Sequence, residues 1–174
     1  MWVFGYGSLM WDNNWEQPLG CLRKKIAVLQ GYERIFNKPS IKYWGTTNNP
    51  CPTLNVVLKK RASCKGMAFE FPDKRQQEIW TYLSNREKGF DLPYLPIKFC
   101  VSSGVKAIVP IYQGNNILNK TIEELTDMTL IASGSKGCCI GYVLNLEEKL
   151  HSLKIYDPTV IALANRIHAK KCLT

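Results

Sequence analysis

Apolar residues at the start of the chain predict a strand that ends in a glycine-bearing loop. Val3 and Phe4 close a short apolar stretch, and Gly5 and Gly7 follow at alternate positions. Glycines weaken a strand unless the backbone has to approach something closely. We therefore expect a loop over residues 6–9 whose backbone N–H groups converge on an anion. A glycine-bearing turn without any ligand explains the same residues.

Alternating apolar and polar positions predict further strands in the first two thirds of the chain. The expected extended segments are residues 26–36, 53–59, 66–71, 97–102 and 105–112. Turns are expected at residues 60–65, at residues 91–96 and over Ser103–Gly104. Residues 39–52 hold three prolines and are expected to form a long loop, a kind of segment that is often functional.

Helical periodicity and capping residues predict helices mainly in the second half of the chain. The expected helices follow Pro72–Asp73 as far as Gly89, run from Thr121 to Ala132 and from Cys139 to Leu153, and extend from Asp157 to Lys170. Strands therefore come first and helices second. This order predicts an α+β domain, 1–174, with a curled, mostly antiparallel sheet or a small β-barrel flanked by helices.

Composition and charge narrow the classes of partner. The chain has 174 residues, of which 45% are hydrophobic and 21% charged, and a formal net charge of +9 that favours anionic partners. The basic residues form short, separate clusters without the aromatic interleaving of RNA-binding modules, so no nucleic acid is expected. No apolar run approaches the roughly 20 residues that cross a bilayer, so no membrane span is expected. The sequence does not indicate an oligomeric state.

Cysteine and histidine usage suggests reduced thiols and no metal. The cysteines are odd in number and contain no CxxC pair: Cys21, Cys51, Cys64, Cys100, Cys138, Cys139 and Cys172. Such usage suits a reducing compartment, so a cytoplasmic protein is expected, with Cys138 and Cys139 as two reduced core or helix residues. His151 and His168 lack metal-ligand spacing, so neither a zinc site nor any other cofactor is predicted.

Glu87 interrupts an apolar helical stripe. Ile79, Leu83 and Glu87 are four residues apart and share one face of the expected helix, whereas Arg86 and Lys88 fall on other positions. Glu87 is therefore either a carboxylate at a cleft edge or a surface residue paired with a neighbour. The helix dipole and partial burial would both raise its carboxyl pKa above the ordinary value of about 4.3, which suits a general base.

Three separated segments resemble the γ-glutamylcyclotransferases, most closely the ChaC-like branch that acts on glutathione. The first segment, similar to the substrate loop of the family, consists of Val3, Phe4, Gly5, Tyr6, Gly7, Ser8 and Leu9. Residues 86–89 resemble the segment that carries the catalytic glutamate of the family, which falls on Glu87. Residues 134–137, with Tyr142 five residues further on, resemble a third motif near the substrate pocket.

The resemblance implies an enzyme without metal or cofactor that cyclises a small γ-glutamyl substrate. Glutathione would yield 5-oxoproline and cysteinylglycine, with Glu87 catalytic and with residues 3–9 and Tyr142 binding the substrate. Residues 41–44 and the pair Cys138–Cys139 depart from the family pattern. Other γ-glutamyl amino acids or amines, or a non-catalytic binding module, therefore remain alternatives. Tyr6 and Tyr142 either line the pocket or belong to the core, and Ser8 either donates to the substrate or stabilises the turn.

Overall fold

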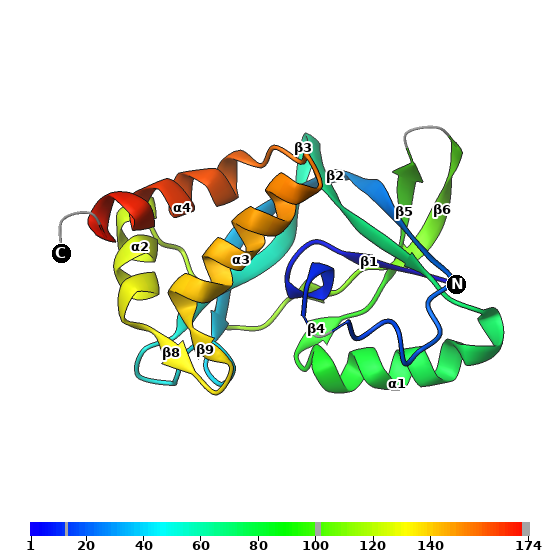
Figure 1. Ribbon diagram of the computed structural model, residues 1–174, viewed down its shortest axis with the longest axis horizontal. Helices are drawn as coiled ribbons and strands as arrows, with labels where there is room; N and C mark the ends of the chain where they lie inside the picture. The colour runs from blue at the N-terminus through cyan, green and yellow to red at the C-terminus, as the bar shows by residue number, and fades with distance from the viewer. Residues whose placement is uncertain (13, 100–101, 172–174) are drawn as a thin grey trace. The chain divides into compact units, whose positions relative to one another are not determined.

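The computed structural model describes the chain except residues 13, 100–101 and 172–174 (Figure 1). The chain forms two compact units. The first unit contains Met1–Arg34 and Val56–Gly114, and the second contains Ile35–Asn55 and Asn115–Thr174.

The central sheet is a closed barrel with the strand order β1-β3-β2-β5-β6. Its strands are β1 (Trp2–Gly5), β2 (Arg23–Ser40), β3 (Cys51–Glu70), β5 (Tyr94–Phe99) and β6 (Ser102–Ile108). β1 pairs antiparallel with β3, β2 with β5, and β5 with β6, whereas β1 meets β6 in parallel at Val3 and Ile108. The predicted α+β fold with a curled, mostly antiparallel sheet is thus confirmed.

Apolar side chains from every strand of the barrel fill its core. Completely or almost completely buried examples are Val3, Phe4, Leu29, Phe69, Ile97 and Ile108. Removing a side chain of this size from water contributes about 1.5–3 kcal/mol. The core therefore holds β1 in place, and with it the segment that follows Gly5.

Two of the predicted turns are wrong because their residues lie inside strands. β3 continues through residues 60–65. Most side chains of this stretch are exposed, which is possible in a strand as well as in a turn, and Arg61 adopts a φ of +67° within the strand. Ser103 and Gly104 lie in β6, and an added Cβ on Gly104 would be 2.8 Å from the Ile97 carbonyl oxygen. Gly104 thus permits close approach of two strands.

Helix α1 (Gln76–Arg86) follows a 3₁₀ turn, η2 (Asp73–Arg75), and buries Ile79 and Leu83 completely. Asp73 does not cap this helix. Arg75 is the N-cap residue and makes no side-chain capping bond, because Asp73 pairs with the N-terminal ammonium group. Beyond α1, Gly89 has a φ of +83°, which favours glycine, and the chain enters β4 (Phe90–Asp91), which pairs with β7 (Ile111–Tyr112). The expected turn at 91–96 is shorter, because β5 already begins at Tyr94.

The second unit contains α2 (Ile122–Ile131), α3 (Cys139–Ser152) and α4 (Pro158–Lys171), which confirms the three helices predicted there. Two short strands, β8 (Ser133–Gly134) and β9 (Gly137–Cys138), form a hairpin directly before α3. The helices pack through buried residues such as Val143, Leu146, Leu163 and Ile167. No helix in the described part of the chain is long and apolar enough to cross a membrane.

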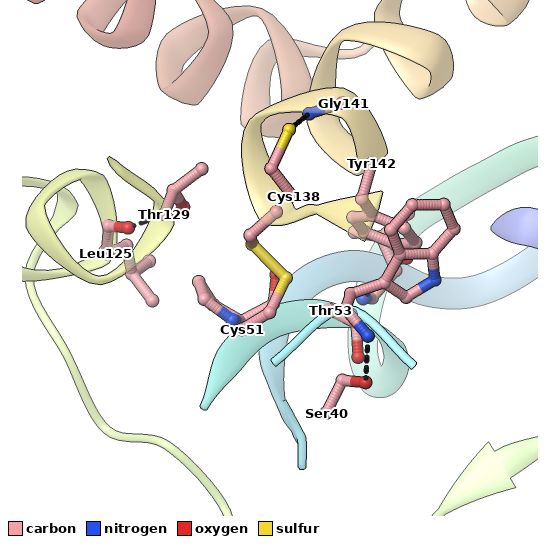
Figure 2. Close-up of a disulfide and its surroundings, with 12 residues drawn as sticks. Ser40, Cys51, Thr53, Leu125, Thr129, Cys138, Gly141 and Tyr142 are labelled. Atoms are coloured by element: carbon pink, nitrogen blue, oxygen red, sulfur yellow. Dashed lines mark hydrogen bonds between the residues drawn. A yellow bond between two sulfur atoms is a disulfide. The ribbon is translucent and has the colours of Figure 1, made fainter. Parts of the chain in front are cut away.

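A disulfide joins Cys51, the first residue of β3, to Cys139, the first residue of α3 (Figure 2). The prediction of reduced cysteines is therefore wrong for these two residues. They are 88 residues apart, so sequence spacing cannot reveal the pairing, and both are completely buried. Cys21, Cys64 and Cys138 are free, whereas Cys100 and Cys172 lie outside the described residues.

Replacing Thr121 by alanine is expected to lower the free energy of unfolding by about 1 kcal/mol, because Thr121 is the N-cap residue of α2. Its hydroxyl accepts from the Glu124 N–H, and the Glu124 carboxylate accepts from the Thr121 N–H. Lys120 and then Thr121 lower the pKa of Glu124 to about 2. The contribution of Glu124 is thus complete above its ordinary pKa of 4.5 and is lost as the pH falls through about 2. Urea unfolding at neutral pH tests the substitution, and an unchanged midpoint would contradict it.

Candidate active site

The N-terminal loop, residues 5–9, leaves the barrel at Gly5 and enters a short 3₁₀ helix, η1 (Ser8–Met10). The Met10 N–H donates to the Gly7 carbonyl at 2.9 Å, and the Trp11 N–H donates to the Ser8 carbonyl at 3.1 Å. The first N–H groups of a helix have no acceptor within it. The N–H groups of Ser8 and Leu9 are therefore suited to a ligand, in line with the loop expected from the sequence.

The two glycines of this loop serve different purposes. A Cβ on Gly5 would lie 2.9 Å from the Leu9 Cβ and 3.3 Å from a ring carbon of Phe69, so glycine lets the loop fold back onto the barrel. Gly7 is the N-cap residue of η1.

Hydrogen bonds that involve buried polar side chains hold the N-terminal loop in place. The Tyr6 hydroxyl donates to the Pro110 carbonyl at 2.7 Å, and the Trp15 indole N–H donates to the Leu9 carbonyl at 2.9 Å. Arg34, almost completely buried, donates from Nε to the Tyr6 carbonyl at 2.9 Å and from Nη2 to the Lys65 carbonyl at 2.6 Å. Sequence reasoning missed Arg34, although a charged residue between buried positions of a strand was a usable signal.

Few side chains of the predicted substrate segment are accessible. Val3 and Phe4 are completely buried in the barrel core, and Tyr6 and Leu9 are nearly so. Among residues 3–9, all of which the structure describes, Gly7 and Ser8 are the partly exposed ones. Any contribution of the others to binding would therefore come from their backbone or from their support of the loop.

Glu87 is the C-cap residue of α1, with a φ of −99° and a ψ of 48°. Its N–H donates to the Leu83 carbonyl at 2.7 Å, and its own carbonyl accepts from the Phe90 N–H at 3.0 Å. The Arg86 Nε donates to the Glu87 Oε1 at 3.1 Å. The expectation that Arg86 points elsewhere is wrong, because helical-wheel positions no longer apply once the backbone leaves the helix at Glu87.

The Arg86 guanidinium connects Glu87 to the N-terminal loop. Its Nη2 donates to the Asp12 Oδ2 at 2.9 Å and to the Ser8 Oγ at 3.3 Å, and its Nη1 donates to the Tyr82 hydroxyl at 3.0 Å. Burial opposes the charge on Arg86, but Glu87, Tyr82 and Asp12 outweigh it and raise the pKa of Arg86 above its ordinary value. The Arg86 guanidinium is thus a permanent cation beside the Glu87 carboxylate.

Tyr142 lies in the second unit, close to the disulfide (Figure 2). Its side chain is buried, its hydroxyl accepts from the Leu54 N–H at 3.1 Å, and its ring centroid is 5.5 Å from that of Trp44. These contacts give Tyr142 a packing role in this unit.

The third motif contacts the segment in which the chain departs from the family pattern. The Ser135 and Lys136 N–H groups donate to the Lys42 and Tyr43 carbonyls at 3.0 and 2.7 Å. An added Cβ on Gly134 would lie 2.6 Å from the backbone of Tyr43, so glycine allows this close approach. The Lys42 and Lys136 ammonium groups lie 5.7 and 5.2 Å from the centre of the Tyr43 ring.

Residues that bind metals do not cluster here. Within the described ranges, no three His, Cys, Asp or Glu side chains are placed to hold a metal ion. His168 lies at the surface, with its Nε2 3.2 Å from the Glu147 Oε2, and His151 is exposed.

Comparisons with known proteins agree with this architecture. The family model described as ChaC-like protein matches residues 1–170, and the chain belongs to this family. A γ-glutamylcyclotransferase 2-3 of Arabidopsis thaliana is 29% identical over 96% of this chain and 88% of its own length. The glutathione-specific γ-glutamylcyclotransferase of Escherichia coli K12 is 28% identical over 90% of this chain and 68% of its own. A crystal structure of the glutathione-specific γ-glutamyl cyclotransferase from yeast shares the fold, with a TM-score of 0.86, 18% identity, and coverage of 97% and 96%.

Proposed function

We propose that this protein is a γ-glutamylcyclotransferase that converts glutathione into 5-oxoproline and cysteinylglycine. The observation that carries the proposal is the link from the Glu87 carboxylate through Arg86 to Ser8 in the N-terminal loop. Membership of the ChaC-like family and the names of its relatives support the same activity.

The reaction requires a folded substrate rather than water. The α-amine of the γ-glutamyl group attacks its own γ-carbonyl carbon, a five-membered lactam forms, and the bond to the leaving nitrogen breaks. Holding the substrate in its ring-closing conformer could contribute several kcal/mol of the barrier reduction. The bond breaks when the tetrahedral intermediate expels the leaving nitrogen, without hydrolysis or oxidation, so the enzyme would be a lyase.

The proposed roles follow from the chemistry of each group. Glu87 takes a proton from the α-ammonium group and returns it to the leaving nitrogen. The backbone N–H groups of the N-terminal loop hold the α-carboxylate or the tetrahedral oxyanion, where loss of one donor costs about 3 kcal/mol. Val3 and Phe4 support this loop from the core, and Ser8 presents its hydroxyl. Tyr142 stays in the proposed binding set on the ground of family resemblance.

A second candidate keeps the reaction and changes the leaving group. It is favoured by residues 41–44, which differ from the family pattern and contact Ser135 and Lys136. Incubation with glutathione and, in parallel, with γ-glutamyl dipeptides separates the candidates. Release of 5-oxoproline and cysteinylglycine from glutathione is the expected result. Release from dipeptides alone would favour the second candidate, and release from neither would leave a binding module.

We also propose that the protein acts in the cytoplasm, where thiols remain reduced. The free thiols of Cys21, Cys64 and Cys138 support this location, whereas the Cys51–Cys139 disulfide counts against it. Imaging of the tagged protein tests it, and secretion would contradict it.

Replacing Gly89 by alanine is expected to lower the free energy of unfolding by about 1–2 kcal/mol, because its φ of +83° strains any residue with a side chain. The strain falls two residues beyond Glu87, so turnover should fall several-fold. Gly31→Ala is the control, because Gly31 has a φ of +78° and open space around an added Cβ. Urea unfolding and turnover are measured for both variants, and equal turnover would contradict the prediction.

A further inference from the structure

We propose that Asp12 and Arg86 form a positioning pair that orients the Glu87 carboxylate toward the substrate held by the N-terminal loop. This inference rests on the proposed function, because Glu87 is the base in that reaction. Its basis is that each of the three nitrogens of the Arg86 guanidinium has a partner, either on α1 and its C-cap or on the N-terminal segment.

The planar guanidinium of Arg86 connects Asp12 to Glu87, so the position of Asp12 affects the orientation of the Glu87 carboxylate. A guanidinium is a rigid fork of donors, so fixing two of its nitrogens determines where the third one points. Asp12 and Ser8 hold Nη2, and Tyr82 holds Nη1. The remaining Nε then points at the Glu87 carboxylate. Asp12 thereby orients the Glu87 carboxylate through Arg86.

Burial strengthens these interactions relative to surface ion pairs. The side chains of Arg86, Asp12 and Glu87 are only 14%, 11% and 14% exposed. Exposed pairs contribute about 0–1 kcal/mol, and partly buried pairs are screened less by solvent and salt. The Arg75–Glu78 pair, next to the start of the same helix, is 31% and 50% exposed and provides a comparison.

An aromatic contact joins the positioning pair to the N-terminal loop a second time. The Tyr82 ring stacks on the Trp15 ring at 5.4 Å with an interplanar angle of 7°. The Trp15 indole N–H in turn donates to the Leu9 carbonyl. Arg86 thus reaches the loop directly at Ser8 and, through Tyr82 and Trp15, at Leu9. Two connections restrict how far the loop and the end of α1 can move apart.

This arrangement matters because the base must reach the α-ammonium group of a substrate gripped by the loop. Misplacement of a catalytic group by 1 Å can cost about 100-fold in rate. Loss of Asp12 or of the fork shape of Arg86 should therefore lower kcat more than it raises KM.

The test compares two substitutions in the pair with two matched controls. Asp12→Asn is expected to lower kcat about 10- to 100-fold with KM changed less than about threefold. Glu78→Gln also removes one carboxylate that pairs with an arginine, and it should leave both constants unchanged. Arg86→Lys keeps the charge and loses the fork, so its kcat should lie between those of Arg86→Gln and wild type. Arg75→Lys is its control.

A titration separates positioning from simple loss of stability. The ¹³C carboxyl signal of Glu87, assigned with the Glu87→Gln variant, is followed against pH. Arg86→Gln removes a cation and leaves the Asp12 charge, so the midpoint should move to higher pH. Asp12→Asn releases the Arg86 guanidinium from its position at the Glu87 carboxylate, so the midpoint should move to higher pH here too. Two other ionisable groups lie near Glu87 in the chain: the Tyr82 hydroxyl accepts a hydrogen bond from Arg86, and the Lys88 side chain is exposed. If Asp12 did not position Arg86, Asp12→Asn would only remove a nearby anion and would move the midpoint to lower pH.

The outcomes distinguish the two proposals. If wild type releases 5-oxoproline and Asp12→Asn matches Glu78→Gln in kcat, the positioning pair is wrong and the proposed function stands. If wild type is inactive on every γ-glutamyl substrate, the proposed function is wrong. The titration then decides the pair alone, since a rise of both midpoints supports it and a fall of the Asp12→Asn midpoint overturns it.

Discussion

Replacing Glu87 by glutamine is expected to abolish nearly all conversion of glutathione while the protein still folds. Glutamine has almost the same shape and can still accept a hydrogen bond from the Arg86 Nε, but it cannot take up a proton. General base catalysis typically contributes about 10²–10⁴-fold. Turnover should therefore fall by about this factor, measured as release of 5-oxoproline, with an unchanged thermal unfolding midpoint.

Glu78→Gln is the matched control for this substitution, because Glu78 is an exposed carboxylate on the same helix and pairs with Arg75. It should retain wild-type turnover. A Glu87→Gln enzyme that keeps more than about a tenth of wild-type turnover would remove Glu87 from the mechanism.

Loss of the Cys51–Cys139 disulfide is expected to lower the free energy of unfolding by about 4 kcal/mol. The bond closes a loop between residues 88 apart in sequence, and closing so long a loop removes much entropy from the unfolded chain. Cys139→Ser also leaves a hydroxyl in a completely buried site. Urea unfolding of wild type with and without dithiothreitol, and of Cys139→Ser, measures the effect.

Cys138→Ser is the control for the disulfide prediction. The exposed Cys138 sulfur accepts from the Gly141 N–H at the start of α3, and a serine hydroxyl can cap the helix in the same way. This variant should unfold like wild type and respond equally to dithiothreitol. If dithiothreitol destabilised Cys139→Ser as much as wild type, the effect would not come from the disulfide.

The helices of the second unit were predictable because their signals are local. Thr121 and Glu124 form the capping box that their spacing indicates, and the Asp157 carboxylate accepts from the Val160 N–H at the start of α4. Each of these interactions joins residues three positions apart, so the sequence contains both partners within one turn.

The strands were harder to delimit because the same residue types occur in turns and on exposed strand faces. Residues 60–65 are mostly exposed and charged or small, a composition that indicated a turn but also suits an exposed stretch of β3. Gly104 indicated a turn, whereas its lack of a side chain allows a close approach to Ile97. Only the partner strand distinguishes these alternatives.

By itself, the sequence determined the α+β class, the glycine loop after the first strand, and Glu87 at the end of a helix whose face is otherwise apolar. Those features depend on neighbours a few residues away. Tertiary structure decided what surrounds Glu87, because Arg86 meets Asp12 and Ser8 across 74 and 78 residues of chain. It likewise decided that Cys51 bonds to Cys139. Such contacts arise when distant segments fold together, and no local pattern encodes which residues then meet.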